Sequence, residues 1–406
     1  MIRFNKRVLS IIFLSFFITL IFSVSYKNVS EAKNSNMIID VTKAPYNAKA
    51  DGIEDDTNAI QWALDMAKEN ESTTILIPEG TYKITKRLII YKNTHIKMDK
   101  GTTLLRSHNA GFFINGESTD IFYGFSGNGN ITIEGGTLDG NIEKYTSGFN
   151  AIGLAHGYNI KILNVTIKDV INAHAIDLNS SKDVLIEGCK FIGFKDTTVN
   201  KENYYSESIQ ISPHTKLGFS GFGAWDGTTC ENVTIKDSYF GPSGTPGTQA
   251  PAVAIGNHSS VHNIFIKDIN ILNNRFNGMT YAGVRLFKFN NSVVKYNIFE
   301  NTNRGIVISS TAANSISSQN IDGSQSGKPQ AGADYQILNN IFKDTIKENI
   351  YAAGSSNEID TAKVTNINIK NNVFINKNSI TGRDNMFFKL TEGVNIEENN
   401  IITLKK

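Results

Sequence analysis

Short alternations of apolar and polar residues recur along this chain of 406 residues. Each repeat has two alternating apolar residues, a polar turn of Asn, Gly or Asp, and a second short segment that ends in Phe, Ile or Leu. A period of two indicates β-strands, because successive side chains of a strand point to opposite faces. The repeats lie at residues 130–138, 159–167, 183–191, 232–240, 269–276, 292–299, 335–342, 366–374 and 393–401.

The spacing of the repeats indicates how these strands bury their apolar faces. Successive repeats end between 23 and 49 residues apart, and the two largest gaps leave room for long loops. Strands this short cannot bury an apolar face alone, but they can when they stack coil on coil. We therefore predict an all-β fold, a right-handed parallel β-helix, that forms a single solenoid domain over residues 33–406.

One segment has a helical pattern instead. Residues 56–69 place apolar side chains on one face at helical spacing, and Asp56 or Thr57 is suited to cap the first turn. We expect this helix to cover the open end of the solenoid, where unpaired strand edges would otherwise invite association. Its apolar face consists of Ile60, Ala63, Leu64 and Ala67.

The first 32 residues have the pattern of a signal peptide. Basic residues precede an uncharged apolar run from Val8 to Val24, and Ser30 and Ala32 fit the recognition positions of a signal peptidase. We expect a secreted or cell-surface protein without stable membrane insertion after cleavage. An uncleaved anchor is the alternative, because a run of 17 residues is at the lower limit for crossing a bilayer.

Charge and cysteine content narrow the possible partners. Removal of residues 1–32 takes away four basic residues and one acidic residue, which changes the formal charge from +2 to −1. The remaining chain has no run of basic residues, so nucleic acid is not an expected partner. The pattern neither requires nor excludes a disulfide between Cys189 and Cys230, and we expect two buried thiols.

Three stretches near the N-terminus resemble a known superfamily. "YNAKADGIEDDTNAIQWALDMA", "ILIPEGTYKI" and "GTTLLR" look like the opening of pectate-lyase-like proteins of the rhamnogalacturonase and epimerase-like branch. The resemblance is specific over residues 38–106 and implies a β-helix that acts on a polysaccharide by hydrolysis, elimination or epimerisation. Some members are phage tailspikes. The motifs "NTD", "GHG" and "RIK" of glycoside hydrolase family 28 are absent from the expected places, so that mechanism cannot be carried over.

A candidate site emerges when the coils are aligned on their inward apolar pairs. The pairs used are Ile152/Leu154, Ile176/Leu178, Ile209/Ile211, Val253/Ile255, Val284/Leu286 and Ile306/Ile308. Around them, ionisable and aromatic side chains gather within about five coils, a combination typical of carbohydrate sites, where rings cover sugar faces and polar groups hold hydroxyls. The candidates are His174, Asp177, Glu207, Gln210, His214, His258, Arg285 and Arg304, with Tyr205, Trp225 and Tyr281 from loops.

Glycoside hydrolysis needs two carboxyl groups, one protonated and one ionised. Asp177 and Glu207 are the predicted pair, with His174 or His258 adjusting their protonation and Arg285 binding a uronate or keeping one carboxylate ionised. We predict that Asp177→Asn and Glu207→Gln abolish turnover and leave stability nearly unchanged, because outward carboxylates contribute little to a core.

The other predicted roles concern substrate binding. Contacts are predicted for Gln210, His214, Arg304, Tyr205, Trp225 and Tyr281, and the loop 213–229 is the candidate wall or lid of a cleft.

Other interpretations remain open. The chain could instead be a polysaccharide lyase or epimerase that acts on a uronate-containing glycan, with Arg285 and His258 as the groups for β-elimination. A lyase could use calcium as a cofactor, but no acidic calcium cluster is evident beside Arg285. We therefore favour a hydrolase without a metal or other cofactor. A non-catalytic glycan-binding or tailspike-like β-helix is the third interpretation. Asp177 could also merely satisfy turn amides, and Arg285 could merely pair with Glu207 or Asp177.

The remaining predictions concern assembly and the turns. A trimer that packs along the solenoid sides is compatible with the sequence, although no pattern indicates one. The paired asparagines, such as Asn273-Asn274 and Asn339-Asn340, are predicted to form ladders in the turns.

Overall fold

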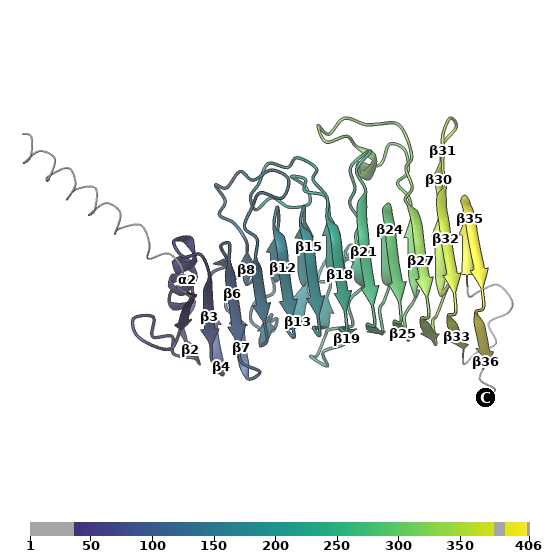
Figure 1. The fold of residues 1–406 in the computed structure, drawn as a ribbon. Helices are drawn as coiled ribbons and strands as arrows, with labels where there is room; N and C mark the ends of the chain where they lie inside the picture. Colours follow the sequence, from purple (N-terminus) through teal and green to yellow (C-terminus); the bar gives the residue numbers. More distant parts are fainter. Residues whose placement is uncertain (1–35, 377–385, 404–406) are drawn as a thin grey trace, which may run out of the picture.

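The computed structural model describes residues 36–376 and 386–403 of the chain. Figure 1 shows a solenoid of stacked coils, with the first strands at one end and the last strands at the other. The strands form three long sheets in which neighbouring strands are parallel, as the spacing of the repeats predicted. The predicted signal peptide, residues 1–32, lies outside the described residues.

Each full coil contributes one strand to each sheet. The first sheet contains β1 (Met37–Asp40), β3 (Thr73–Ile77), β6 (Thr94–Met98), β9 (Ile131–Glu134), β12 (Tyr158–Leu163), β15 (Lys182–Glu187), β18 (Glu231–Lys236), β21 (Ile266–Leu272), β24 (Phe289–Lys295), β27 (Ala333–Leu338), β32 (Val364–Lys370) and β35 (Thr391–Glu397). The second contains β2 (Asp51–Asp55), β4 (Gly80–Ile84), β7 (Thr102–Arg106), β10 (Thr137–Asp139), β13 (Thr166–Ile171), β16 (Lys190–Lys195), β19 (Tyr239–Gly241), β22 (Arg275–Asn277), β25 (Ile298–Glu300), β28 (Ile341–Lys343), β33 (Val373–Asn376) and β36 (Asn400–Thr403). The third contains β5 (Leu88–Ile89), β8 (Phe113–Ile114), β11 (Ile152–Leu154), β14 (Ile176–Asn179), β17 (Glu207–Ser212), β20 (Val253–Gly256), β23 (Ala282–Phe287), β26 (Ile306–Ser309), β29 (Ile350–Ala353) and β34 (Met386–Lys389).

The predicted helix is present at the N-terminal end of the solenoid. It consists of α2 (Thr57–Asp65) and a 3-10 turn, η1 (Met66–Lys68), and its four predicted apolar side chains are fully buried. The predicted cap by Asp56 is wrong, because the Asp56 carboxylate accepts hydrogen bonds from the backbone amides of Lys49 and Ala50 instead. The backbone amide of Thr57 donates to Asp55 at 3.0 Å.

Two ladders run through the coils and explain the repeated sequence. The phenylalanines that end the repeats stack in the core, and neighbouring ring centroids from Phe191 to Phe374 lie 4.7–5.2 Å apart. The predicted asparagine ladder is confirmed: the Asn297 side chain is fully buried and donates to the carbonyl of Ile271 at 2.8 Å. Each ladder asparagine therefore supplies hydrogen-bond partners to backbone groups of the turns, and each phenylalanine adds apolar surface to one continuous core.

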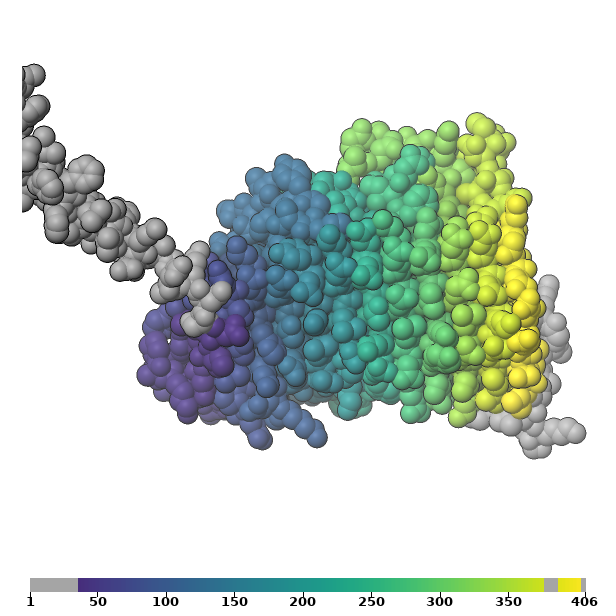
Figure 2. Space-filling view, viewed as in Figure 1, coloured from purple at the N-terminus to yellow at the C-terminus, as the bar shows by residue number. Residues whose placement is uncertain are grey.

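Long loops project from one side of the stack, between the third and the first sheet. Figure 2 shows them as two raised regions, one in the blue part of the chain and one in the light green part. The light green region includes the 3-10 turn η2 (Ile316–Ser318), and a small antiparallel hairpin of β30 (Ser355–Ser356) and β31 (Thr361–Ala362) follows it. Within residues 36–376 and 386–403, no helix is long and apolar enough to cross a membrane.

Candidate functional site

The third sheet carries the predicted site residues on neighbouring coils. Asp177 of β14 lies in register with Gln210 of β17, as predicted. The prediction for β20 was wrong by two residues, because Ile209 pairs with Ile255 and not with Val253. Gly256, rather than Ala254, therefore stands beside Gln210, and this shift places His258 next to the coil of β17.

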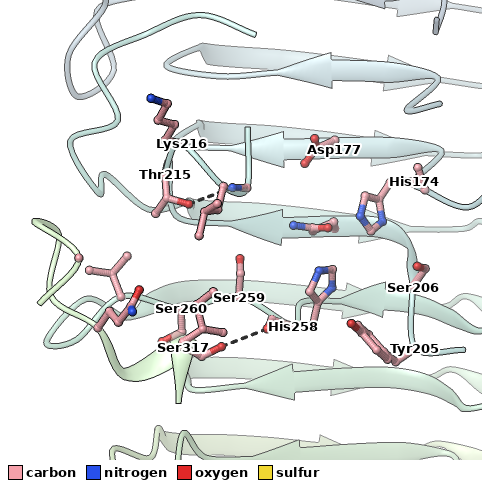
Figure 3. Close-up of a pocket in the computed structure, with 18 of the residues that line it drawn as sticks. His174, Asp177, Tyr205, Ser206, Thr215, Lys216, His258, Ser259, Ser260 and Ser317 are labelled. Carbon is pink, nitrogen blue, oxygen red and sulfur yellow. Dashed lines mark hydrogen bonds between the residues drawn. The ribbon is translucent and has the colours of Figure 1, made fainter. Parts of the chain in front are cut away.

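A cleft of about 580 Å³ lies over the outer face of this sheet. Figure 3 shows His174, Asp177, Tyr205 and His258 around it. The predicted loop 213–229 lines one wall through its residues 215–218. The opposite wall comes from residues 316–323, which belong to one of the two long gaps between repeats but were not predicted as part of the site. Gap length was the available signal, because a long insertion between coils must project as a loop.

Asp177 faces the cleft but is 1% exposed. Its carboxylate accepts hydrogen bonds from the side-chain amides of Asn150 at 2.7 Å and Asn179 at 2.8 Å, so it does not merely satisfy turn amides. Burial raises the pKa of Asp177 above its ordinary value, although His174 and Asn179 act in the opposite direction.

Glu207 lies deeper than the sequence indicated. It has the same parity along β17 as the inward residues Ile209 and Ile211, and its side chain is fully buried and does not line the cleft. The idea that its removal leaves stability unchanged was therefore based on a wrong placement. His258 Nδ1 lies 2.7 Å from Glu207 Oε2, and Arg285 Nη1 lies 3.9 Å from Glu207 Oε1.

Glu207 and His258 shift one another's pKa values. Burial alone would raise the pKa of Glu207, but the charge and hydrogen bond of His258, with a smaller contribution from Arg285, hold it below the ordinary value. Burial acts to lower the pKa of His258, and the Glu207 carboxylate raises it by more. The expectation that Arg285 keeps a carboxylate ionised thus agrees with the geometry, and so does its simpler pairing with Glu207.

His174 is oriented by the same residue. Its Nδ1 lies 2.6 Å from the main-chain oxygen of Glu207, and a carbonyl oxygen can only accept a hydrogen bond, so Nδ1 carries the proton. The rings of His174 and His258 are stacked with centroids 5.8 Å apart. Two imidazoles at the edge of the cleft are therefore both held by Glu207, one through its backbone and one through its side chain.

The aromatic and cationic candidates beyond the cleft form a second group. Arg285 lies over the rings of Tyr205, Tyr281 and Phe287 at 5.5–5.7 Å from their centroids. Arg304 donates to Glu348 at 2.6 Å and lies 5.9 Å from the centroid of Tyr281. Neither Arg304 nor Tyr281 lines the cleft. Both lie on the adjoining coils of the third sheet.

Two predicted binding residues lie elsewhere. His214 is fully buried against His156, with ring centroids 4.3 Å apart, and burial lowers its pKa to about 4. Trp225 is 36% exposed, donates from Nε1 to the carbonyl of Phe219, and is not a lining residue. The predicted substrate contact of His214 does not fit its position, because the loop folds over a small apolar cluster. The contact of Trp225 stays a prediction, since its ring lies beside Lys216, which lines the cleft.

Gln210, the remaining candidate, lines the cleft with 2% exposure. Its Nε2 donates to Ser212 at 2.6 Å, and its Oε1 has no hydrogen-bond partner among the described residues. Asn150 was not predicted as a site residue, although its side chain donates to Asp177 and accepts a hydrogen bond from the backbone amide of His174.

Family models match most of this architecture. Residues 38–118 match the model described as rhamnogalacturonase A/epimerase, pectate lyase-like, and residues 150–335 match that of the right handed beta helix region. The chain has the pectate lyase-like β-helix fold. The predicted superfamily and the right-handed parallel β-helix are thereby confirmed.

Related chains include adhesins and phage proteins. Plasmin and fibronectin-binding protein A of Streptococcus pneumoniae is 31% identical over 388 residues, which cover 88% of this chain and 53% of that protein. The pre-neck appendage protein of Bacillus phage phi29 is 25% identical over 264 residues, which cover 55% of this chain and 30% of that protein. The chain therefore spans about half of the first relative and less of the second.

Solved structures extend the comparison. A structure of PfbA, a surface adhesin of Streptococcus pneumoniae, superimposes with a TM-score of 0.73 at 28% identity and covers 90% of this chain and 85% of that one. The family 28 exopolygalacturonase of Yersinia enterocolitica superimposes with a TM-score of 0.56 at 13% identity and covers 90% of this chain and 78% of that one. The second likeness shows a shared fold alone.

Proposed function

We propose that this protein acts outside the cell as a glycan-binding β-helix, with the cleft over the third sheet as its binding site. The cleft itself carries the proposal. Its volume of about 580 Å³ lies within the usual range for sites that enclose a small ligand or a segment of a chain. Polar side chains of His174, Asp177, Gln210 and His258 line it, beside the ring of Tyr205.

This lining suits a saccharide. Sugar hydroxyls need donors and acceptors at fixed positions, and their apolar C–H faces pack on aromatic rings. His174, Asp177 and Gln210 are buried, and Asn150 and Asn179 hold Asp177, so these groups are ordered before a ligand arrives. His258 is partly exposed, but its ring is held by Glu207.

The extracellular location rests on the relatives and on the predicted signal peptide. A protein whose name states that it binds plasmin and fibronectin, and a structure described as a surface adhesin, are similar to nearly all of the described chain. These relatives favour a binding function over a catalytic one.

A second candidate function is cleavage of the bound glycan. The observation that favours it is the pairing of His258 with a fully buried Glu207, beside the Asp177 carboxyl in the same cleft. A histidine oriented by a carboxylate can remove a proton, and a neighbouring carboxyl group can protonate a leaving oxygen. In this version His258 and Asp177 contact the substrate, and Glu207 acts through His258.

The experiment incubates the purified protein with a panel of acidic and neutral polysaccharides and follows three signals: retention of glycan, new reducing ends, and ultraviolet absorbance from unsaturated uronates. Retention without either product supports the binding function. Reducing ends alone establish hydrolysis, and both products together establish elimination. A protein that retains and cleaves no member of the panel contradicts the proposal.

Variants locate the binding site. Tyr205→Ala and Gln210→Ala should each weaken retention about tenfold, the loss expected for roughly 1.4 kcal/mol of contact energy. Tyr296→Ala is the matched control, because that tyrosine is 55% exposed and lies between β24 and β25, away from the third sheet. Equal effects at Tyr205 and Tyr296 would exclude the cleft as the site.

A further inference from the structure

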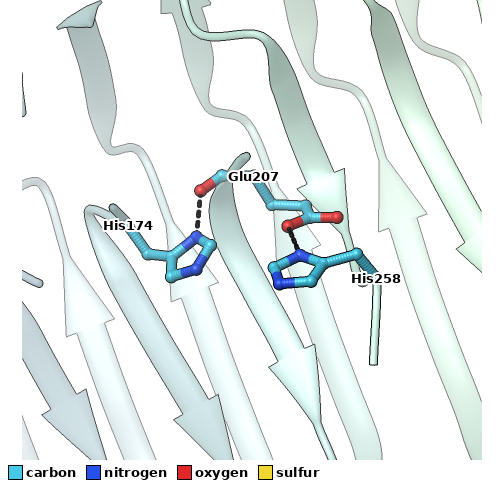
Figure 4. Close-up of side chains that lie close together, drawn as sticks. All are labelled: His174, Glu207 and His258. Carbon is cyan, nitrogen blue, oxygen red and sulfur yellow. Dashed lines mark hydrogen bonds and ion pairs between the residues drawn. The ribbon is translucent and has the colours of Figure 1, made fainter. Parts of the chain in front are cut away.

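We propose that His174, Glu207 and His258 form a binding site for a divalent transition-metal ion such as Zn²⁺. Among the described residues, these three side chains each offer one ligand atom, and the three atoms all lie within 4.8 Å of one another. They come from three consecutive coils, at β14, β17 and the loop after β20 (Figure 4). The sequence indicated no metal, because the residues are far apart in the chain and match no known ligand spacing.

The tautomer of His174 is already the one that a metal requires. Its Nδ1 donates to the Glu207 carbonyl at 2.6 Å, so its Nε2 carries the free lone pair. Histidines that bind metals usually donate their second ring nitrogen to a carbonyl or carboxylate in this way, which fixes the ring orientation. His174 lines the cleft and is 8% exposed, so this lone pair has a fixed orientation at the cleft surface.

Glu207 supplies the charge. Its Oε2 lies 2.7 Å from His258 Nδ1, whereas its Oε1 is buried and has no hydrogen-bond partner among the described residues. Arg285 is 3.9 Å from Oε1, a distance that allows attraction but no hydrogen bond. A fully buried carboxylate that lacks a hydrogen-bond donor on one of its oxygens is unfavourable, and a bound cation would compensate its charge.

The donor set selects the kind of ion. Two imidazoles and one carboxylate are typical ligands of zinc and neighbouring transition metals, whereas calcium and magnesium prefer oxygen ligands throughout. Zinc bonds of about 2.0–2.2 Å in a tetrahedron require ligand atoms roughly 3.3 Å apart. Because the three ligand atoms lie within 4.8 Å of one another, no pair has to approach by more than about 1.5 Å. His174 and His258 border the cleft, which leaves the fourth position open to water or to a ligand hydroxyl.

The positive charge of Arg285 opposes the ion, so we expect moderate affinity rather than the tight binding of a structural zinc site. The inference does not depend on the proposed function, since it concerns the metal alone. Its test therefore contains no glycan.

The test is a calorimetric titration of chelator-treated full-length protein with Zn²⁺. We expect one Zn²⁺ per chain, no heat with Ca²⁺, and a visible absorption band of four-coordinate geometry with Co²⁺. His174→Gln and His258→Gln should each lower the zinc affinity at least tenfold. Circular dichroism confirms that the variants are folded.

His95→Gln is the matched control. His95 Nε2 lies 2.8 Å from Glu134 Oε2 on the first sheet, so it forms a histidine–glutamate pair that has no third ligand within residues 36–376 and 386–403. The control should bind zinc as the unmodified protein does. Absence of zinc uptake by the unmodified protein, equal binding of Ca²⁺, or equal losses in the His95 and His258 variants would overturn the proposal.

Discussion

Replacement of Glu207 by glutamine tests whether the buried charge of this carboxylate contributes to the stability of the fold. The side chain is fully buried between His258 and Arg285, whose side chains are 30% and 16% exposed. Removing one member of a buried ion pair leaves the other charge without compensation and typically costs 3–5 kcal/mol. His258 can lose its proton and is partly solvated, so we expect about 3 kcal/mol at neutral pH.

The assay is equilibrium unfolding in urea at pH 7, followed by far-ultraviolet circular dichroism. A shift of the midpoint at unchanged slope reports a change in the free energy of unfolding. Glu231→Gln is the matched control, because Glu231 forms a 2.8 Å ion pair with Lys267 on the first sheet and is 29% exposed. Its loss should cost less than about 1 kcal/mol.

The comparison of the two glutamine variants decides the matter. If Glu207→Gln and Glu231→Gln shift the midpoint equally, Glu207 behaves as an outward surface carboxylate and the burial argument fails. A double variant, Glu207→Leu with Arg285→Met, should recover part of the loss, because replacing both members of a buried pair by apolar groups is often nearly neutral.

Three further predictions concern buried polar groups. The folded-state pKa of His214 is about 4, below its unfolded value, so its contribution to stability is complete above pH 6.5 and is lost as the pH falls toward 4. Between pH 7 and pH 4.5, the free energy of unfolding measured in urea should change by up to about 3 kcal/mol less in His214→Phe than in the unmodified protein. An equal change in both proteins would contradict this prediction. Asn297→Ala should cost about 1–3 kcal/mol in the same assay because it leaves ladder groups unpaired, while Asn395→Ala, at an exposed strand position with ordinary backbone angles, should cost little. Cys189 and Cys230 are free and buried, and burial raises the pKa of each thiol to about 12, so a thiol reagent should modify neither in the native protein and both in urea; rapid native labelling would show that the coils open.

Much of the candidate site could be located from the sequence, but its internal order could not. Asp177 and Gln210 were correctly paired because the apolar residues on either side of each have the same spacing. The register of β20 was ambiguous, since Val253 and Ile255 are both apolar and either can occupy the inward position. A shift of two residues leaves the same side chains facing inward and outward, so the sequence pattern does not distinguish the two registers.

The placement of Glu207, His214 and the loop 316–323 required the folded chain. A carboxylate at the first residue of a strand looks the same in sequence whether it faces solvent or lies under a neighbouring coil. His214 stands in a loop rich in glycine and aromatic residues, which resembled a sugar-binding wall, yet its ring packs beneath that loop against His156.

The sequence by itself therefore determined the architecture of this protein, because each coil repeats the same sequence features. These are alternating apolar residues, asparagines in the turns, and phenylalanines that stack on their equivalents one coil away. It also determined that ionisable and polar side chains cluster on one sheet. Only the tertiary structure decided which of those groups meet, since contacts between His174, Glu207 and His258 depend on loop paths and on one shift of register. Local spacing sets strands and their faces, whereas a site is set by distances between coils, which no single repeat encodes.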